Sequence, residues 1–564
     1  MKIALVQMNS TIGDFEGNAR AIVRHVAQAL EEAGGKLDLV VFPELSLCGY
    51  PPMDLLDQRT FVEGTMSALR LLQRSLPPDL AVAAGYVDEN RSGSGRGLVN
   101  AFSVIHRGRV IFTQTKTLLP TYDVFDEARY FEPAAERKTF ELGGKRIGFA
   151  ICEDFWWESP PSPSFRYPVD PVSELLDGGM DILLVPSASP FVAGKLDTRL
   201  KLAESTTRRG RIPVLYCNAS GANDSLVFDG RSFVMNPEGR LCGICGWDEE
   251  TLFYDSETHS VWTRDGKPAP TCAEGKSAEE HHRAIVTGIG DYMRKSGFSK
   301  ACLGLSGGID SALVAVLAAE ALGADKLTCI AMPSRFSSPG SLNDSVELCA
   351  RLGIRLERLS IEGPFSAFLD VLAAPFAGKP WDLAEENLQA RIRGCLLMAW
   401  SNKFGSLLLT TGNKSEIAAG YCTLYGDMCG ALAPIGDLYK TEVYSLAEHL
   451  NARAESRGEP APIPRPILEK APSAELRHDQ KDQDSLPEYA LLDAILKEYI
   501  EENSTFGEIV SKGFDPEVTR KVLDMTAKAE YKRRQAAPVV KVSKRAFGVG
   551  RRLPLARRVY ETER

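Results

Sequence analysis

One stretch near the middle of the chain, residues 301–317, constrains the fold more than any other. It begins with an apolar run that ends at Leu305, turns through Ser-Gly-Gly (306–308), and becomes apolar again after Asp310. We interpret the first run as a buried parallel strand and the second as a helix packed beside it. Glycines allow the backbone N–H groups of the turn to face a ligand, and the positive end of the helix completes an anion cradle. The stretch therefore predicts a phosphate site in an α/β domain.

The turn differs from a Walker A loop, because it lacks the lysine of Gly-x-x-x-x-Gly-Lys-Ser/Thr. An ordinary strand-to-helix turn is the alternative interpretation. The string Ser-Gly-Gly-Ile-Asp-Ser resembles the loop of the N-type ATP pyrophosphatases, which split ATP into AMP and pyrophosphate. The resemblance implies that Mg²⁺ binds Asp310. It implies that the phosphates of ATP bind Gly304, Leu305, Ser306, Gly307, Gly308, Ile309, Asp310 and Ser311.

Bulk properties limit the class of protein. A chain of 564 residues needs at least two hydrophobic cores. Its net charge of −9 predicts no nucleic-acid partner, and no apolar run reaches the roughly 18 residues that span a membrane. The 12 scattered cysteines predict free thiols in a reducing cytoplasm, with Cys242 and Cys245 on a hairpin and no zinc site. The N-terminus enters a strand at once, so we expect no signal peptide.

Residues 1–265 alternate short apolar strands with amphipathic helices, which predicts sheets covered by helices. Three predicted strand ends carry chemistry. Glu44 follows one strand, Lys116 follows another, and Cys152 ends a third. Glu44 could take the proton of the thiol, and Lys116 could stabilise an oxyanion. Each of the three also has an alternative interpretation: Glu44 could lie on a surface turn, Lys116 could be a solvated charge, and Cys152 could be a thiol of the core.

Together and in this order, the three residues resemble the Glu-Lys-Cys triad of the nitrilase (carbon–nitrogen hydrolase) superfamily, which has an αββα sandwich fold. Segments 120–131 and 186–191 are similar to the glutaminase branch. Cys152 is followed by Glu-Asp, where many stand-alone nitrilases differ. The resemblance implies a supporting role for Glu127. It implies that glutamine binds Tyr122, Ser189 and Lys195.

The stretch from about residue 258 to 276 lacks apolar periodicity, and we expect a boundary there. We predict a first domain at 1–265, a linker at 266–278 and a second domain at 279–564. The second domain again alternates strands and helices. That alternation predicts a doubly wound parallel sheet, with ligands at the carboxyl ends of its strands. The resemblance to the N-type ATP pyrophosphatases implies that this sheet is Rossmann-like, of the adenine nucleotide alpha hydrolase type.

Residues 410–416 close one of these strands and add Thr411 and Glu416. A second carboxylate facing Asp310 suits Mg²⁺ on a triphosphate, since magnesium takes few protein oxygens. A helix N-cap with a first-turn glutamate is the alternative, and both interpretations can hold together.

Six further segments of the second domain resemble NAD⁺ synthetase: 386–393, 425–428, 437–441, 472–476, 482–487 and 530–535. With the nitrilase-like region ahead of them, the resemblance is to the glutamine-dependent branch over nearly the whole chain. It implies that Asn387, Glu416 and Lys532 contact deamido-NAD⁺, and that Thr411 and Lys440 contact ATP.

The resemblance implies an enzyme that hydrolyses L-glutamine at Cys152 and uses the ammonia, with ATP and Mg²⁺, to amidate deamido-NAD⁺. AMP, pyrophosphate and glutamate are the other products. Another ATP-pyrophosphatase amidotransferase, or a non-catalytic relic that binds metabolites, remains the alternative. We expect a homo-oligomer. We expect residues 421–438 and 473–487 to be lids over the substrate, because both are polar or rich in glycine and proline.

Overall fold

The structure, a computed structural model, describes every residue except 161–164, 265, 273–276 and 559–564. The chain forms two compact units, Met1–Glu274 and Gly275–Arg564. The domain limits 1–265 and 279–564 stay predictions, because residue 265 and part of the linker 266–278 lie outside the described residues.

The first unit is built around two mixed β-sheets, in each of which the central strands are parallel and the outer ones antiparallel. One sheet consists, in spatial order, of β15 (Val261–Trp262), β14 (Glu250–Asp255), β1 (Lys2–Gln7), β2 (Leu39–Val41), β3 (Ala81–Glu89), β4 (Leu98–His106) and β5 (Arg109–Thr115). The other consists of β13 (Leu241–Ile244), β12 (Phe233–Met235), β9 (Val214–Asn218), β8 (Ile182–Ser187), β7 (Lys145–Phe149) and β6 (Thr139–Leu142). A separate hairpin pairs β10 (Ser220–Asn223) with β11 (Leu226–Asp229).

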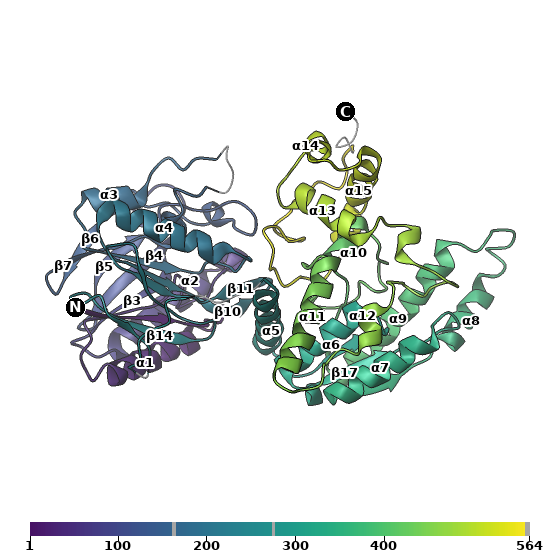
Figure 1. Ribbon diagram of the computed structural model, residues 1–564. Coiled ribbons are helices and arrows are strands. Elements are labelled where there is room, and N and C mark those ends of the chain that lie inside the picture. Colours follow the sequence, from purple (N-terminus) through teal and green to yellow (C-terminus); the bar gives the residue numbers. More distant parts are fainter. Residues whose placement is uncertain (161–164, 265, 273–276, 559–564) are drawn as a thin grey trace. The chain divides into compact units, whose positions relative to one another are not determined.

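Alternation along the strands divides this unit into layers. Ile3 and Leu5 of β1 point into the core between the two sheets, whereas Ala4 and Val6 point outward. The outward face packs on α1 (Phe15–Glu32) and α2 (Arg59–Ser75), and the outer face of the second sheet packs on α3 (Pro171–Asp177) and α4 (Lys195–Gly210). Figure 1 shows these helices outside the sheets, so the predicted αββα sandwich is confirmed.

Helix α1 shows how the sequence specifies one of these layers. Asp14 caps it by accepting a hydrogen bond from a first-turn N–H, which would otherwise lack a partner. Ala19, Ile22, Val26 and Ala29 follow at helical spacing and are fully buried. The helix therefore has one apolar face, which covers the sheet.

The second unit contains a parallel sheet with helices on both faces. Its strands, in spatial order, are β18 (Arg355–Arg358), β17 (Leu327–Ala331), β16 (Ala301–Gly304) and β19 (Leu407–Leu409). The helices that contact it are α6 (Ile309–Leu322), α7 (Pro339–Leu352), α8 (Glu362–Leu372) and α9 (Leu383–Phe404). The chain order reverses between β16 and β19, where a doubly wound sheet binds its ligands. The predicted doubly wound architecture is confirmed.

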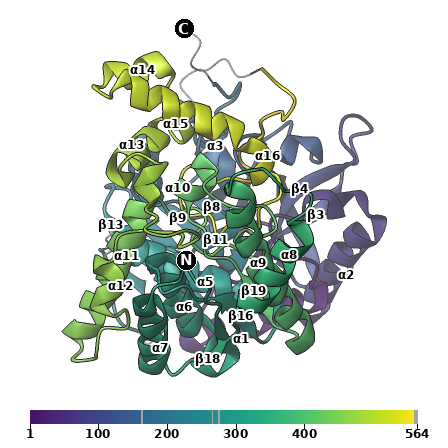
Figure 2. The ribbon, with the colours of Figure 1, turned by 90° about the vertical axis from the view of Figure 1, so that its right-hand side faces the viewer.

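The remaining helices of this unit pack on these and on one another. Helix α5 (Ser277–Lys295) packs with α6 and with α11 (Lys440–Ser456). The others are α10 (Lys414–Ala419), α12 (Arg465–Glu469), α13 (Tyr489–Ile500), α14 (Phe506–Ser511), α15 (Pro516–Lys528) and α16 (Glu530–Arg533). Figure 2 shows α13, α14 and α15 grouped away from the strands, over a separate apolar core.

Several predicted strand limits are wrong in detail. Strand β7 ends at Phe149, so Cys152 does not end a strand but begins a short 3₁₀ turn at Cys152–Phe155. Strand β15 lies inside the stretch 258–276 that we expected to be irregular, and α5 begins at Ser277, inside the predicted linker 266–278. The predicted hairpin is confirmed, because β12 and β13 pair across a turn at 236–240.

All 12 cysteines are free thiols, as predicted. Among the described residues, no helix combines the length and the apolar character that crossing a membrane requires.

Candidate active sites

Lys116 is the centre of a buried polar cluster in the first unit. Its Nζ lies 2.7 Å from Glu44 Oε1 and 2.8 Å from Glu127 Oε1. The hydroxyl of Tyr50 donates to the same Glu127 oxygen at 2.9 Å. Burial disfavours the ammonium, but the charges of Glu127 and Glu44 outweigh it and raise the pKa of Lys116 well above its usual value. Lys116 is therefore held as a cation between two carboxyl groups.

Glu44 is fixed by donors on both carboxylate oxygens. Besides Lys116, Asn100 Nδ2 donates to Oε1 at 2.8 Å, and the backbone N–H of Ala188 donates to Oε2 at 3.1 Å. Burial and the charge of Glu44 raise the pKa of Glu127 to about 7, against the opposing effect of Lys116.

Cys152 lies on a sharp turn with φ +48°, a left-handed conformation that few non-glycine residues adopt. Burial, together with the charge of Glu44, raises the pKa of its thiol well above the usual value, while Lys116 opposes the shift. The thiol is therefore neutral in the resting site, and its attack on a substrate requires a base.

Asp154 anchors this turn beside the loop of Lys116. Its Oδ2 accepts a hydrogen bond from Ile151 N at 3.1 Å, and its Oδ1 accepts from Thr117 N at 2.9 Å and Leu118 N at 2.7 Å. Two loops far apart in sequence are thus joined through one buried carboxyl. This role of Asp154 was not predicted, and the only signal for it in the sequence was the Glu-Asp pair that follows Cys152.

The residues predicted to bind glutamine divide between two groups. Tyr122 donates to Glu153 Oε1 at 3.0 Å, and Tyr167 donates to the same oxygen at 2.5 Å. Burial raises the pKa of the Glu153 carboxyl, and the two hydroxyls oppose that shift. Neither Glu153 nor Tyr167 was among the predicted residues, although Glu153 directly follows the predicted nucleophile.

Ser189 and Lys195 form the second group. Arg199, fully buried and paired with Asp229 at 2.9 Å, donates to the Ser189 carbonyl at 3.0 Å. Lys195 Nζ donates to the Pro190 carbonyl at 3.2 Å. Arg199 thus fixes the backbone at Ser189, a role that no local sequence signal indicated.

The second unit contains a cavity of about 540 Å³ at the carboxyl ends of β16 and β19. Of the residues predicted for this unit, the cavity is lined by Gly304, Leu305, Ser306, Gly308, Ile309, Asp310, Ser311, Asn387, Thr411, Glu416, Lys440 and Lys532. Gly307 is the one predicted residue that does not line it. A Cβ at Gly307 would lie 2.2 Å from the carbonyl oxygen of Ser341, and φ is +79°, so this position requires glycine for packing.

Asp310, Glu416 and Lys440 form a charged cluster in the cavity. Lys440 Nζ pairs with Asp310 Oδ2 and lies 3.3 Å from Glu416 Oε1, while Asn413 Nδ2 donates to Asp310 Oδ1 at 2.8 Å. Burial and the charge of Asp310 raise the pKa of Glu416 to about 8, with Lys440 opposing. Asn413 caps α10 and Glu416 lies in its first turn, so the interpretation of this segment as a helix N-cap is confirmed, although Asn413 was not predicted as a site residue.

This cluster has the donors that a divalent cation on a triphosphate requires. Two carboxyl groups share one site, and in the described part of the chain they face a single ammonium there. Among the described residues, no group of three or more His, Cys, Asp or Glu side chains could hold a metal by itself. Asp310 and Glu416 therefore fit Mg²⁺, which completes its shell with phosphate and water oxygens.

The residues predicted to contact deamido-NAD⁺ line another part of the cavity wall. Lys532 Nζ donates to the carbonyls of Gly420 and Cys422, each at 2.7 Å, and Asn387 Oδ1 accepts from Thr423 at 2.7 Å. Parts of both predicted lids, 421–438 and 473–487, also line the cavity, but whether they move stays a prediction.

Arg393 is a lining residue that the sequence analysis missed. It donates to the Met332 carbonyl at 3.1 Å, and burial lowers its pKa to about 10. It lies on α9 within segment 386–393, so the only sequence signal was its place in a family-like motif.

Comparisons with known proteins agree with both halves. A family model described as carbon–nitrogen hydrolase matches residues 2–257, and one described as NAD synthase matches residues 281–536. The chain is 45% identical to the glutamine-dependent NAD(+) synthetase of Synechocystis sp., covering 98% of each chain. It is 42% identical to that of Rhodobacter capsulatus, covering 99% of this chain and 98% of the relative.

Solved structures match over the same length. That of the glutamine-dependent NAD+ synthetase from Acinetobacter baumannii, in complex with ADP, is 35% identical, with a TM-score of 0.76 and 98% of each chain covered. That from Cytophaga hutchinsonii is 20% identical, has a TM-score of 0.81 and supports the fold alone. On the full-length identities above, the chain belongs to the glutamine-dependent NAD(+) synthetase family.

Proposed function

We propose that this protein amidates deamido-NAD⁺ to NAD⁺ with ATP and with ammonia released from L-glutamine. One observation carries the proposal: each unit holds its own constellation, a buried thiol with Glu44 and Lys116 in one and a cavity behind a Ser-Gly-Gly loop in the other. The names of the relatives support the same assignment.

In the first unit, Cys152 attacks the amide carbon of glutamine. Because the thiol is neutral, Glu44 accepts its proton as the C–S bond forms, and the Lys116 ammonium stabilises the oxyanion. Glu44 returns this proton to the amide nitrogen as the tetrahedral intermediate collapses, so ammonia leaves and a thioester remains. Water then attacks the thioester, giving up a proton to Glu44, and that proton returns to the departing sulfur, so glutamate and the free thiol form. Glu127 keeps Lys116 in place, and Tyr122, Ser189 and Lys195 hold the substrate.

In the second unit, the nicotinate carboxylate of deamido-NAD⁺ attacks the α-phosphate of ATP and pyrophosphate leaves. Ammonia then displaces AMP from the acyl adenylate, and the amide of NAD⁺ forms. The loop 304–311 binds the phosphates through its N–H groups, with Thr411 and Lys440 on ATP and Asn387 and Lys532 on deamido-NAD⁺. Asp310 and Glu416 would hold Mg²⁺, which offsets negative charge on the phosphates when bound.

The test supplies ATP, Mg²⁺ and deamido-NAD⁺ with either glutamine or ammonium and measures NAD⁺ and AMP. Absence of AMP with every substrate present would favour the non-catalytic alternative or an amidotransferase that adenylates another acceptor. We predict that Asp310→Asn abolishes NAD⁺ formation from both nitrogen sources and leaves glutamine hydrolysis in place. Near-normal synthesis by this variant at saturating Mg²⁺ and ATP would exclude the metal role of Asp310.

We further propose that the protein is a cytoplasmic homo-oligomer. The free thiols support a reducing compartment. Large apolar side chains on and between α8 and α9 are exposed, as a subunit interface requires: Phe368, Val371, Trp381, Leu383 and Phe404. Light scattering of the purified protein tests the assembly, and Val371→Lys with Leu383→Lys should lower its mass if these residues are buried in it.

A further inference from the structure

One lysine lies beside the phosphate loop without a role in the chemistry above. Gly307 packs directly on the backbone of Ser341, near the start of α7. The hydroxyl of Ser341 in turn accepts a hydrogen bond from Lys470 Nζ. Lys470 also lines the cavity. Only Ser341 separates its ammonium from the phosphate loop, because Ser341 contacts both Lys470 and Gly307.

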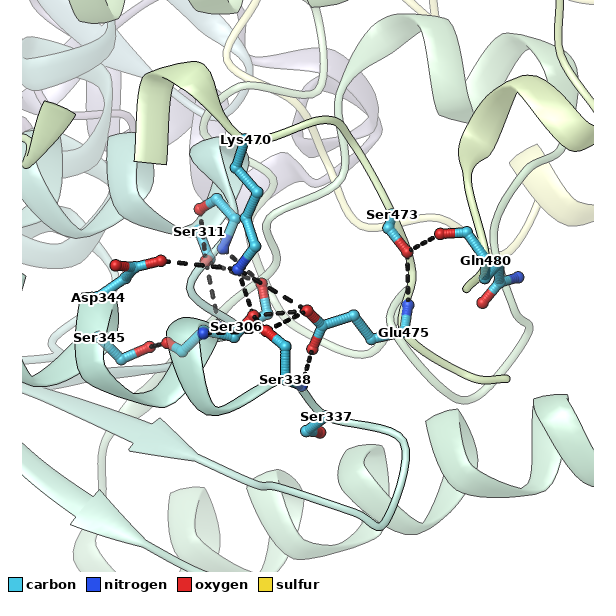
Figure 3. Close-up of polar contacts among 12 residues, drawn as sticks. Ser306, Ser311, Ser337, Ser338, Asp344, Ser345, Lys470, Ser473, Glu475 and Gln480 are labelled. Atoms are coloured by element: carbon cyan, nitrogen blue, oxygen red, sulfur yellow. Dashed lines mark hydrogen bonds and ion pairs between the residues drawn. The ribbon is translucent and has the colours of Figure 1, made fainter. Parts of the chain in front are cut away.

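Lys470 is held by carboxylates at long range. Its Nζ is 3.6 Å from Asp344 Oδ2 and 3.7 Å from Glu475 Oε1, and 29% of its side chain is exposed. Figure 3 shows the lysine reaching toward the α7 serines between these two acids. Ion pairs of this length on a partly exposed side chain are weak, so a stronger anion can replace them.

Glu475 occupies the place that such an anion would take. Its carboxylate accepts hydrogen bonds from Ser341 Oγ at 2.6 Å, from Ser338 Oγ at 3.0 Å and from Ser338 N at 3.3 Å (Figure 3). The backbone at Glu475 has φ +49°, a strained conformation for this residue. An acidic side chain thus sits among two hydroxyls, an N–H and an ammonium, all of which also bind phosphate oxygens.

The other cations of the cavity are committed elsewhere. Among the described residues, Arg393, Lys440, Lys470 and Lys532 are the cationic side chains that line it. Arg393 and Lys532 donate to backbone carbonyls, and Lys440 joins the two carboxyl groups of the predicted metal site. Lys470 differs from the other three. Its partners are the side chains of Ser341, Asp344 and Glu475, none of which belongs to the predicted metal site.

We propose that Lys470 binds the phosphate chain of ATP and the pyrophosphate that leaves it, in exchange for Glu475. In the empty site Glu475 neutralises the lysine and ties segment 473–487 to α7. When the phosphates enter, Lys470 pairs with them and Glu475 loses its cation. The inference rests on the ATP role proposed above for loop 304–311, and it adds a residue to that role.

The experiment uses ammonia-dependent NAD⁺ synthesis by the full-length protein at fixed Mg²⁺, with inorganic pyrophosphate and AMP as separate inhibitors. Lys470→Ala should raise the KM for ATP and the inhibition constant of pyrophosphate on the order of 10- to 100-fold, the range for a lost charged hydrogen bond. Because AMP lacks the leaving phosphates, its inhibition constant should change less than about twofold on this reasoning. Glu475→Gln should act in the opposite direction and tighten pyrophosphate binding.

Lys481→Ala is the matched control, because Lys481 is exposed in the same segment and does not line the cavity. It should leave both inhibition constants unchanged. The inference would be overturned if pyrophosphate inhibited Lys470→Ala as strongly as it inhibits the unchanged protein. It would also be overturned if the variant raised the inhibition constants of pyrophosphate and AMP by the same factor. A third result against the inference would be that Glu475→Gln raises the inhibition constant of pyrophosphate as much as Lys470→Ala does. If the unchanged protein makes no NAD⁺, the proposed function itself has failed, a result distinct from these.

Discussion

At the scale of single residues, the first unit depends on a few groups whose protonation is set by burial. Lys116 carries the positive charge between Glu44 and Glu127, while the Cys152 thiol stays neutral. Since the ammonium stabilises an oxyanion only while charged, the two carboxyl groups around it have a chemical as well as a packing role.

We predict that Cys152→Ala loses glutamine-dependent NAD⁺ synthesis and keeps ammonia-dependent synthesis. The thiol alone supplies the nucleophile, and no residue of the second cavity belongs to its cluster. Removing one sulfur from a buried turn costs on the order of 1 kcal/mol, which leaves the fold intact. Rates with each nitrogen source are compared, with a thermal melt as the fold control. Retained glutamine use would exclude Cys152 as the nucleophile.

We predict that His281 makes the second unit sensitive to acid. Burial lowers its pKa to about 4, whereas the unfolded chain has the ordinary value near 6.5. Below that value the unfolded state binds a proton that the folded state does not, so stability falls as the pH falls from about 6.5 toward 4. The loss is about 2 kcal/mol between pH 6.5 and 5.

Urea unfolding at several pH values measures this loss. His281→Gln removes the titrating group, so its unfolding free energy should depend less steeply on pH across the same window. An equal slope in both proteins would assign the acid sensitivity to other groups. Glu320 is not one of them in this window, because its pKa is lowered to about 2 against its burial by His282 and Arg453, and its contribution is lost only below about pH 4.5.

At the scale of elements, segments 421–438 and 473–487 line the cavity mostly with loops, with one short 3₁₀ helix at Asp482–Asp484. The second segment is tied to α7 through Glu475 and is stiffened by Ser473, which donates to the Gln480 carbonyl at 2.6 Å (Figure 3). Such segments open at low free-energy cost when few apolar contacts hold them.

We predict that both segments gain protection from hydrogen exchange when ATP and deamido-NAD⁺ are added together. The reason is that each contributes lining residues, which the ligands would contact. Helix α1, in the other unit, is the internal reference and should exchange equally in both states. Equal protection of the segments with and without ligands would mean that they do not close.

The scale of elements is also where sequence reading was least accurate. Strands β1 and β8 are continuous buried runs without alternation, the pattern that predicts buried strands from sequence. Strand β5, which directly precedes Lys116, alternates between exposed and half-buried residues over most of its length, so no continuous apolar run marks its limits. Edge strands are specified by their partners more than by their own composition.

At the scale of the whole molecule, every described apolar core lies within one unit. The cores between and outside the two sheets belong to Met1–Glu274, and those around β16–β19 and α13 belong to Gly275–Arg564. A unit with its own core can unfold as a cooperative block.

We predict that calorimetry shows two unfolding transitions, and that ATP with Mg²⁺ raises the midpoint temperature of only one of them. A ligand stabilises the unit that binds it, by about 2.7 kcal/mol at a hundredfold excess over its Kd. Asp310→Asn should abolish the upward shift, and Cys152→Ala should preserve it. A single transition that shifts as a whole would mean that the two units unfold together.

The sequence by itself determined the order of the motifs, the two α/β classes and the chemical groups at the loops. These depend on local patterns: apolar runs, the Ser-Gly-Gly turn, and Glu44, Lys116 and Cys152. Only the tertiary structure decided which side chains meet. Asp154 joins the loop of Lys116, and Lys470 meets Glu475 beside α7, through contacts that no spacing predicts. The physical reason is that a buried polar group must find a partner wherever the fold supplies one, and the partner's position in sequence does not affect the energy of the bond.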